Sequence, residues 1–450
     1  MFAYRFTVAF LNSPILSRLI LGTLRRVRPI AILLGDYYVT SHAHVTEVLS
    51  RTADFTVHDA LQPGMPWGPF LLTTDWSEVH QRDRNILRSF ACNTDPGRID
   101  AIVHESCVKS LQSESLGGEA FRLDFAAEYA EPAVLAVIER YFGVRPLNGR
   151  AEDMKQALRL LSSHIMAQAP PDSDIRTRTD EAIAVLTLHI GSEVTQAIER
   201  ARRGDLKPGP ENTVLERMAL RFAAGGEPPW FTPDWIRRFL TGLLATAAGT
   251  MVRASVHIVD RLLADGEAMT KTRRAATALS ADVDLGNRNF PSLAPGTGAQ
   301  HAFETNSRGI FEQHLLEALR FRPMLPLLVR HCPRDVVLGE GSAFERTIKG
   351  GSAVKVGLVS GMFDPAVFRV PGSFLDNSEG LRPGASYLHF GFGPRYCFGT
   401  YVARIVTCEI VRLVLQAGTL DRSVGRAGRP IYEAAAVRHL VLTVTPDAGG

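Results

Sequence analysis

The most constraining feature of the chain is a glycine-rich run that ends at a cysteine and is followed by a strongly helical segment. The run reads Phe390-Gly391-Phe392-Gly393-Pro394-Arg395-Tyr396-Cys397-Phe398-Gly399, and the helical pattern begins near Thr400. Glycines allow tight turns and close approach to a flat ligand because they lack Cβ. Amides at the amino end of the helix favour an anion at Cys397. The run predicts a buried thiolate ligand, and a structural cysteine in a glycine-rich turn is the alternative.

A long helix is predicted from residue 233 to about residue 265, with Thr232 as amino cap, Pro233 in the first turn and Gly266 at its end. At 1.5 Å per residue it is about 50 Å long, enough to cross the whole molecule. Its middle, residues 243–251, contains small and weakly polar side chains. These side chains allow either a flat group or another helix to pack against the backbone.

The remaining pattern is mostly helical, with a few short strands. Helical periodicity covers residues 43–50, 80–90, 99–113, 125–142, 152–168, 177–203 and 307–321. Strand-like segments are residues 29–34, 37–40, 327–330, 336–338, 353–358 and 439–445, and residues 284–298 have the composition of a loop. Because no repeat or composition break divides the chain, we expect one large domain, mainly α with small β-sheets, over residues 29–450. An N-terminal segment, residues 1–28, precedes it.

Charge and cysteine content exclude several classes of protein. The chain has 50 basic and 47 acidic residues, a net charge of +3, so nucleic acid is not an expected partner. Its five cysteines include no C-x-x-C pair, which argues against a disulfide framework and structural zinc. The apolar stretches before residue 29 are interrupted by Asn12, Pro14 and Arg18, so no transmembrane anchor is expected. We expect a soluble, cytoplasmic protein; an amphipathic helix on a membrane surface at residues 16–24 is the alternative.

Five residues of the cysteine run carry a family resemblance. Phe390, Gly393, Arg395, Cys397 and Gly399 match the F-x-x-G-x-R/H-x-C-x-G signature, and the chain thereby resembles the cytochrome P-450 haem-thiolate proteins of the soluble bacterial type. The resemblance implies a single cytochrome P-450-like fold whose long central helix crosses the haem. It also implies that Cys397 is the axial ligand of haem b iron.

The resemblance assigns further residues to the haem. His80 and Arg84 resemble the family's H-x-x-x-R pair, and Arg330 and Arg395 resemble two other positions that reach a propionate. Charge-assisted hydrogen bonds from such donors offset the desolvation of two carboxylates. For His80 or Arg84 taken singly, a solvated helix face is the alternative.

Two other motifs concern the fold. Glu317 and Arg320 lie three residues apart on a predicted helix and resemble the family's E-x-x-R pair, which implies a structural role. A solvated surface pair is the alternative. Residues 362–374 resemble the segment that precedes the cysteine loop in the family, with Phe363 as the departure.

The long helix departs from the family at one position. When Thr250 is aligned with the family's threonine, Gly249 replaces the acid that, in the family, relays protons with that threonine. A second register places Met251 and Val252 at the acid and the alcohol. The carboxylate is missing in both, so Thr246, a water chain or a substrate group would substitute for it. We expect Thr250 to assist proton delivery, and Gly249→Asp or Gly249→Glu to raise coupling if the missing acid limits it.

The resemblance implies a monooxygenase that acts on a small hydrophobic molecule. Residues 58–70, 168–174 and 325–328, with the centre of the long helix, resemble the family's substrate walls and are mostly apolar. Because no flavin, nicotinamide or iron-sulfur motif is present, a separate ferredoxin or flavodoxin is expected to supply electrons. Arg404 is a candidate for docking it, and a solvated helix face is the alternative. Alternatives are a peroxygenase, a thiolate-haem isomerase or dehydratase, and a haem sensor or carrier without turnover.

Overall fold

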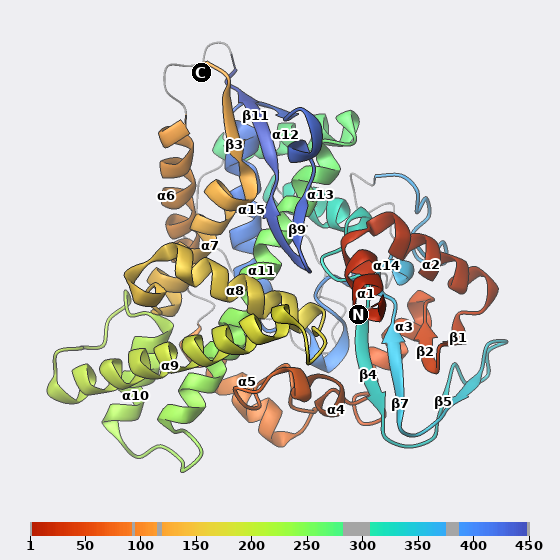
Figure 1. Ribbon diagram of the computed structural model, residues 1–450, viewed down its shortest axis with the longest axis horizontal. Coiled ribbons are helices and arrows are strands. Elements are labelled where there is room, and N and C mark those ends of the chain that lie inside the picture. Colours follow the sequence, from red (N-terminus) through yellow and green to blue (C-terminus); the bar gives the residue numbers. More distant parts are fainter. Residues whose placement is uncertain (1, 92–94, 115–118, 282–306, 375–386, 448–450) are drawn as a thin grey trace.

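The computed structural model describes residues 2–91, 95–114, 119–281, 307–374 and 387–447. The described part is mostly helical and contains four small sheets. In Figure 1 the strands gather in two places, β1, β2, β4, β5 and β7 at the lower right and β3, β9 and β11 at the top, with helices over the rest. This agrees with the predicted mainly α fold. The predicted loop at residues 284–298 lies outside the described residues.

Residues 78–224 form a series of helices. They are α5 (Glu78–Phe90), α6 (Pro96–Glu114), α7 (Glu131–Val137), α8 (Ala151–Met166), α9 (Asp174–Arg203) and α10 (Val214–Ala224). Wide π-helical turns, Phe125–Ala130 and Ile138–Phe142, flank α7, so the predicted helix over residues 125–142 is continuous. Helix α10 was not predicted; it begins with a capping box in which Thr213 and Glu216 bond to each other's backbone N–H.

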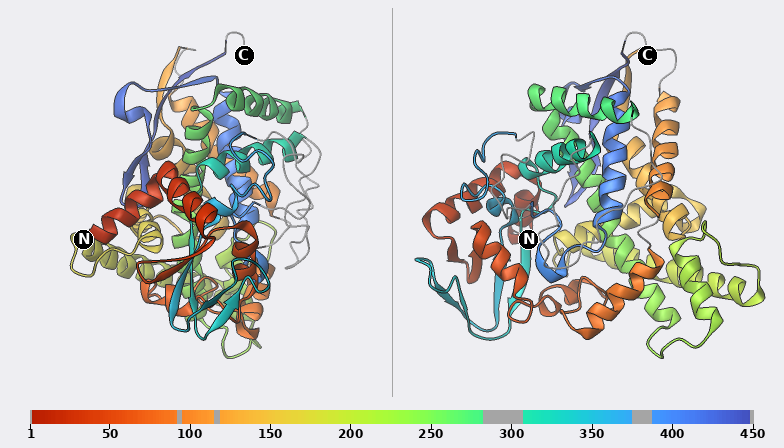
Figure 2. Two further views of the ribbon diagram at one scale, coloured as in Figure 1. Left: turned by 90° about the vertical axis from the view of Figure 1, so that its right-hand side faces the viewer. Right: turned by 180° about the vertical axis from the view of Figure 1, so that it is seen from behind.

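Helix α11 (Pro233–Leu262) is the central element of the fold. It contacts α8, α9, α13 (Ser307–Phe321) and α15 (Thr400–Gln416), and it crosses the middle of the molecule in Figures 1 and 2. The predicted cap is confirmed, because the Thr232 hydroxyl accepts the Trp235 N–H at 3.1 Å. The predicted end at Gly266 is wrong. Asp265 accepts the Ala268 N–H at 3.1 Å and so opens a separate helix, α12 (Gly266–Ala281).

A four-stranded sheet lies beside the N-terminal helices. Its order is β1 (Ile30–Leu33), β2 (Asp36–Val39), β7 (Ser352–Val356) and β4 (Leu328–Cys332), and all its pairs are antiparallel except β2 with β7. The helices on this side are α1 (Phe2–Asn12), α2 (Pro14–Val27), α3 (His42–Ser50), α4 (His58–Leu61) and α14 (Leu358–Gly361).

The other sheets are smaller. One joins β3 (Phe121–Asp124), β11 (Val441–Thr445) and β8 (Thr419–Arg422); the others pair β9 (Ile431–Glu433) with β10 (Ala436–His439) and β5 (Val336–Leu338) with β6 (Arg346–Ile348). The predicted strand over residues 439–445 is therefore divided. At Leu440 the N–H bonds to the Asp124 carboxylate at 3.2 Å and the carbonyl accepts the Phe125 N–H at 2.8 Å, so β10 and β11 join different sheets.

Among the described helices, α11 alone has the length and hydropathy of a membrane span, and 72% of its most apolar stretch is buried in the protein. Helices α1 and α2 reach the same criterion only when joined, and they are bent by 99°.

Candidate cofactor site

The cysteine run forms a closed loop that packs against α3. The Cys397 N–H donates to the Phe390 carbonyl at 2.9 Å, which closes the loop. Gly393 has φ +70°, a conformation that favours glycine, and a Cβ there would lie 3.0 Å from the Leu49 carbonyl oxygen. The Thr400 hydroxyl donates to the Cys397 carbonyl at 2.8 Å where α15 begins. The loop thus presents Cys397 from a fixed backbone, as its sequence predicts.

The Cys397 side chain is exposed in the structure, whereas the sequence predicted a buried thiolate. Desolvation by the surrounding protein nevertheless raises the pKa of the thiol above that of an ordinary cysteine. The Gly399 N–H, Arg84 and the Thr400 hydroxyl act in the opposite direction, because each favours the thiolate. The side chain is thus exposed and still has protein close around it, which indicates a recess of the fold. A cysteine packed in a turn, the alternative reading, would lack that exposure.

One face of α11 also borders open space. Leu243, Thr246, Ala247 and Thr250 are half-buried, and their spacing puts all four on one face of the helix. Because α11 is a core helix, partial exposure along this face indicates space within the fold. The Thr250 hydroxyl donates to the Thr246 carbonyl at 2.7 Å, which leaves its lone pairs free to accept a hydrogen bond.

Gly249 lies against a neighbouring helix. The Ser162 hydroxyl of α8 accepts the Gly249 N–H at 3.1 Å and donates to the Ala245 carbonyl at 2.8 Å, so it stands between two groups that a regular helix would join directly. A Cβ at position 249 would lie 2.4 Å from the Ser162 Cβ. An acid at this position would therefore collide with α8 rather than extend into open space, which revises the expected effect of Gly249→Asp.

Helix α5 supplies two of the predicted cofactor donors. The Ser77 hydroxyl caps it by accepting the His80 N–H at 3.2 Å. His80 Nδ1 lies 3.2 Å from the Thr74 hydroxyl, and the Arg84 guanidinium donates to the Tyr396 carbonyl at 2.8 Å. His80 Nε2 and Arg84 Nε are buried and have no hydrogen-bond partner among the described residues. Both side chains are buried, so the solvated-face alternative is wrong.

The other two donors lie beside them. Arg395 donates through one nitrogen to the Leu71 and Leu72 carbonyls at 2.9 and 3.0 Å, and through the other to the Thr74 carbonyl. Arg330 is buried on β4. Within the described part of the chain, its guanidinium donates only to the carbonyl of the adjacent Val329, at 2.9 Å.

These four side chains, of which Arg395 is half-buried and the other three are buried, form a group with little negative charge to balance it. Desolvation, with Arg330 and Arg84 nearby, lowers the pKa of Arg395 to about 9, and desolvation lowers those of Arg84 and Arg330 to about 10. Desolvation with Arg395 and Arg84 lowers the pKa of His80 to about 3, so His80 is neutral. The carboxylate that opposes these shifts at Arg330 and Arg395 is Asp75, which already accepts the Val57 N–H at 2.6 Å. A group that carries two carboxylates would supply the missing charge, so these residues fit haem.

The Glu317–Arg320 pair is structural in its geometry. Both side chains are fully buried, and Arg320 Nε donates to the Glu317 carboxylate at 2.9 Å. The Arg320 guanidinium also donates to the carbonyls of Met362, Pro371 and Ser373, and the Tyr387 hydroxyl donates to Glu317 at 2.9 Å. The pair thereby fastens α13 to the segment ahead of the cysteine loop. A solvated surface pair, the alternative, is excluded.

Arg404 does not have the place expected of a docking residue. Its side chain is 19% exposed and forms an ion pair with Glu312, which is buried on α13. A cation engaged in this way offers little charge to a partner protein, so the expectation for Arg404 is wrong.

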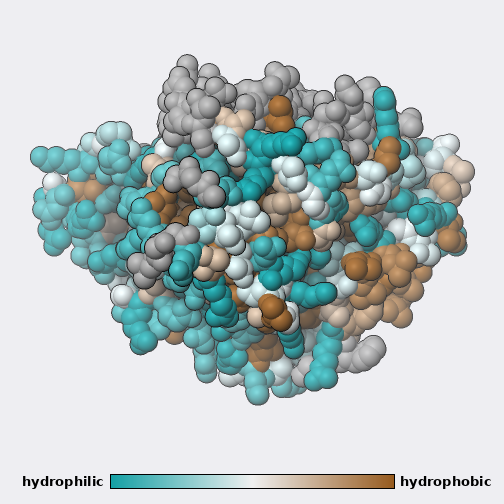
Figure 3. All heavy atoms as spheres, turned by 90° about the horizontal axis from the view of Figure 1, so that it is seen from above, coloured by the Kyte–Doolittle hydropathy of each residue, from teal (hydrophilic) through white to brown (hydrophobic). Residues whose placement is uncertain are grey.

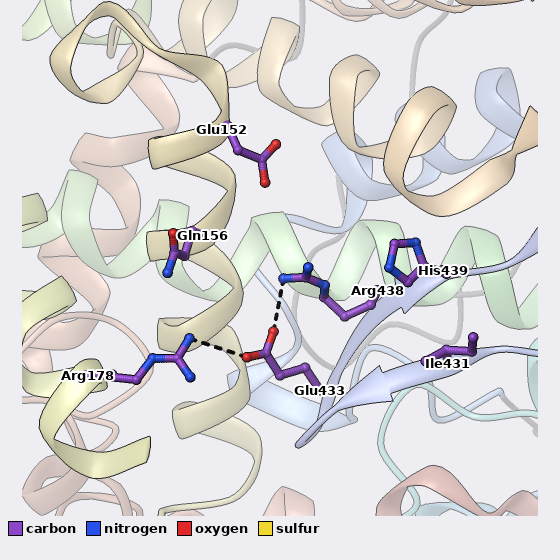
Figure 4. A pocket seen from close by; sticks show the side chains of 7 residues that line it. All are labelled: Glu152, Gln156, Arg178, Ile431, Glu433, Arg438 and His439. Carbon is purple, nitrogen blue, oxygen red and sulfur yellow. Dashed lines mark hydrogen bonds and ion pairs between the residues drawn. The ribbon is translucent and has the colours of Figure 1, made fainter. Parts of the chain in front are cut away.

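Some residues at the site were not predicted. Ser162 was missed, although it belongs to a polar Ser162-Ser163-His164 run on an otherwise apolar stretch of helix. A separate surface pocket was also missed; in Figure 4 it lies between α8, α9 and the β9–β10 hairpin. There Glu433 bridges Arg178 and Arg438 at 3.4 and 3.0 Å. None of the predicted site residues lines it.

Parts of the chain are similar in sequence to known proteins, and the fold is similar to that of solved structures. Residues 306–440 match the family model for cytochrome P-450. The steroid 17-alpha-hydroxylase/17,20 lyase of Oryzias latipes is 34% identical over 26% of this chain and 23% of its own length. The cyclomarin C epoxidase CymV of Salinispora arenicola is 24% identical over 66% of this chain and 62% of its own length. The crystal structure of CalO2 has a TM-score of 0.72 at 18% identity and covers 97% of both chains. The chain spans about a quarter of the length of the steroid hydroxylases it matches first.

The cysteine loop and the arginines near it fit a cofactor that a thiolate ligates. The match over residues 306–440 includes the cysteine loop and identifies this part of the chain as similar to cytochrome P-450, and the solved structure of cytochrome P-450 TbtJ1 shares the fold of the chain at a TM-score of 0.71. The cofactor of that family is haem, held through a cysteine.

Proposed function

We propose that this protein is a haem-thiolate monooxygenase that oxidises a small hydrophobic molecule. The observation that carries the proposal is the Cys397 thiol in its closed loop, together with Arg84, Arg330 and Arg395, none of which forms an ion pair with another described residue. The relatives named as a hydroxylase and an epoxidase support an oxygen-inserting reaction. Bound haem supplies the redox chemistry that inserts one atom of dioxygen into the substrate, while two electrons and two protons convert the other atom to water.

Different residues of the site would hold different parts of the cofactor. Cys397 would hold the iron as a thiolate, the form that the Gly399 N–H and Arg84 favour. His80, Arg84, Arg330 and Arg395 would bind the propionates. Phe390, Gly393 and Gly399 shape the loop, and its Cys397–Phe390 backbone bond of 2.9 Å fixes the direction of the sulfur. Glu317 and Arg320 brace the segment that leads to it.

Helix α11 supplies the opposite wall. Leu243 and Ala247 give it an apolar surface that excludes water and suits a hydrophobic substrate. The Thr250 hydroxyl donates to the Thr246 carbonyl at 2.7 Å in the resting protein, and its lone pairs would accept a hydrogen bond from a single water molecule that delivers protons at this wall. The electrons come from a ferredoxin or a flavodoxin.

The missing acid favours a second candidate, a peroxide-dependent peroxygenase. Position 249 carries no carboxylate, and its helix face is closed by Ser162. Peroxide brings both oxygen atoms, two electrons and two protons, so it needs neither a reductase nor that relay.

Turnover of a panel of hydrophobic substrates separates the two candidates. Product formed with reductase, ferredoxin and NAD(P)H but not with peroxide supports the monooxygenase. Product with peroxide alone would refute it in favour of the peroxygenase. The carbon monoxide complex of the reduced protein tests the cofactor independently, because the thiolate-specific absorption band requires a haem ligated by Cys397.

A further inference from the structure

The outer face of α2 is apolar where a surface helix is usually polar. Its inner face buries Leu21 completely against a cluster that contains Phe321, Val359 and Phe363. On the outer side, Ile15, Leu19 and Val27 are 72%, 65% and 75% exposed. A helix of a water-soluble protein normally presents charged and polar residues on that side.

The exposed apolar side chains continue from α2 onto its neighbours. Of the fifteen exposed large hydrophobic residues in the described chain, seven lie within its first 34 residues. We call these seven the N-terminal apolar surface, and they are Phe6, Ile15, Leu19, Val27, Ile32, Leu33 and Leu34. Figure 3 shows a brown patch at the right of the molecule, the side on which α2, β1 and β2 lie in Figure 1. Such a concentration marks an interaction surface.

The charged side chains of this N-terminal segment are all positive. The first 35 residues contain five arginines and no aspartate or glutamate. Arg5, Arg26 and Arg28 are exposed and form no ion pair with the described residues. Many other surface arginines of the described chain are paired with carboxylates, as Arg51 is with Glu47 at 2.7 Å. An anionic partner would complement the three unpaired charges.

The N-terminal helices are held rigidly to the core. Arg253 of α11 is fully buried and donates to the carbonyls of Leu11 and Ala435 at 2.5 and 2.7 Å and to the Asn12 side chain at 2.9 Å. Leu11 also packs with Ala167 and Ala435. The surface is thus preorganised on the folded protein and does not depend on a loose terminal segment.

We propose that the N-terminal apolar surface docks the protein on an anionic phospholipid bilayer, with α1 and α2 in the plane of the interface. The apolar side chains enter the boundary between headgroups and acyl chains, and Arg5, Arg26 and Arg28 contact the phosphates. A second copy of the chain is a poorer occupant, because a twofold contact through this surface would bring the same unpaired arginines together.

The test is flotation of the full-length, haem-loaded protein with two kinds of vesicle, one of phosphatidylcholine alone and one that also contains phosphatidylglycerol. We expect binding to the anionic vesicles that weakens with added salt. An arginine near such a bilayer changes partitioning by about five-fold, so Arg26→Glu/Arg28→Glu is expected to lower binding by roughly ten-fold or more. Ile15→Ser/Leu19→Ser/Leu34→Ser is expected to lower it by a similar factor through lost insertion.

The matched control is Val185→Ser/Leu188→Ser on α9, where the side chains are 46% and 75% exposed but lie outside the surface. This variant is expected to bind as the original protein does. Circular dichroism and the haem spectrum verify that each variant is folded. Equal binding to both vesicles, no binding, or equal loss in the α9 control would overturn the proposal, as would a dimer in sedimentation velocity that the triple substitution dissociates. Because the readout is partitioning, a failure of this test leaves the proposed monooxygenase activity standing, and a failure of the turnover test leaves the membrane proposal standing.

Discussion

The contact between Gly249 and Ser162 provides a quantitative test of how α11 is built. In Gly249→Ala the new Cβ would lie 2.4 Å from the Ser162 Cβ and 2.6 Å from its hydroxyl oxygen, so α8 and α11 must move apart. Overpacking of this kind costs about 1–3 kcal/mol. The movement also weakens the bonds from the Ser162 hydroxyl to Gly249 and Ala245, each worth about 1 kcal/mol. Alanine regains about 1 kcal/mol of helix propensity.

We therefore expect Gly249→Ala to lower the free energy of unfolding by about 2–3 kcal/mol. The assay is urea unfolding of the single variants and of Ser162→Gly/Gly249→Ala, which removes the obstructing atoms. The double variant is expected to be about 1–2 kcal/mol more stable than the sum of the single effects. Ser163→Gly is the control, because its hydroxyl accepts the Ala435 N–H at 3.0 Å and does not contact α11 at Gly249. Additive effects with Ser162→Gly, or equal coupling with Ser163→Gly, would refute the reasoning.

The same contact separates two effects of an acid at position 249. Gly249→Asp alone is expected to disturb α8 and not to raise the coupling of electron use to product. Ser162→Gly/Gly249→Asp provides room for the carboxylate and is expected to raise coupling above that of Ser162→Gly. Higher coupling in Gly249→Asp alone would show that the helices separate easily.

Other predictions concern the cofactor site. Cys397→Ser should abolish the thiolate-haem band of the reduced carbon monoxide complex, and a retained band would exclude Cys397 as the ligand. Arg395→Leu should speed transfer of haem to an acceptor apoprotein by about ten-fold or more, since a charge-assisted bond contributes about 1.5–3 kcal/mol. The pKa of His80 is lowered to about 3 in the fold, so the haem-free protein should lose stability as pH falls from 6.5 towards 3, by at most about 1.4 kcal/mol per pH unit from this group. Urea unfolding at pH 7 and 5 should show a smaller loss in His80→Gln, and an equal loss would contradict the shift. Arg320→Leu leaves the Glu317 carboxylate buried without its partner and should cost about 3–5 kcal/mol by urea unfolding; a cost below 1 kcal/mol would exclude a bracing role.

The cysteine loop was the most predictable part of the site because its determinants are local. Gly393 is needed because its backbone has φ +70° and because a Cβ there would lie 3.0 Å from the Leu49 carbonyl oxygen. Thr232 and Pro233 are likewise adjacent in the sequence and mark the start of α11. The predicted helix over residues 80–90 and the predicted strand at residues 327–330 are confirmed as the elements that carry His80, Arg84 and Arg330. That Arg84, Arg330 and Arg395 form no ion pair with the described residues emerges only when α5, β4 and the loop are brought together.

Long-range contacts account for the expectations that failed. Position 249 faces α8 because of a bond to a residue 87 positions away, and periodicity alone does not specify which neighbour a helix face meets. Arg404 reads as a surface residue of an amphipathic helix, but its partner Glu312 comes from α13. The division at Leu440 depends on Asp124, which lies 316 residues earlier and accepts the Leu440 N–H.

The buried arginines differ in how their charge is balanced, and this difference separates a cofactor site from the supporting structure. Arg320 has the Glu317 carboxylate within 2.9 Å, and Arg159 is paired with Glu131 in the same manner. Arg84, Arg330 and Arg395 bond instead to backbone carbonyls, and their pKa values are lowered to between about 9 and 10. A fold keeps such desolvated charges at a cost to its own stability. The carboxylates of a bound cofactor remove that cost, so cofactor binding and stability of the fold are linked at these three arginines.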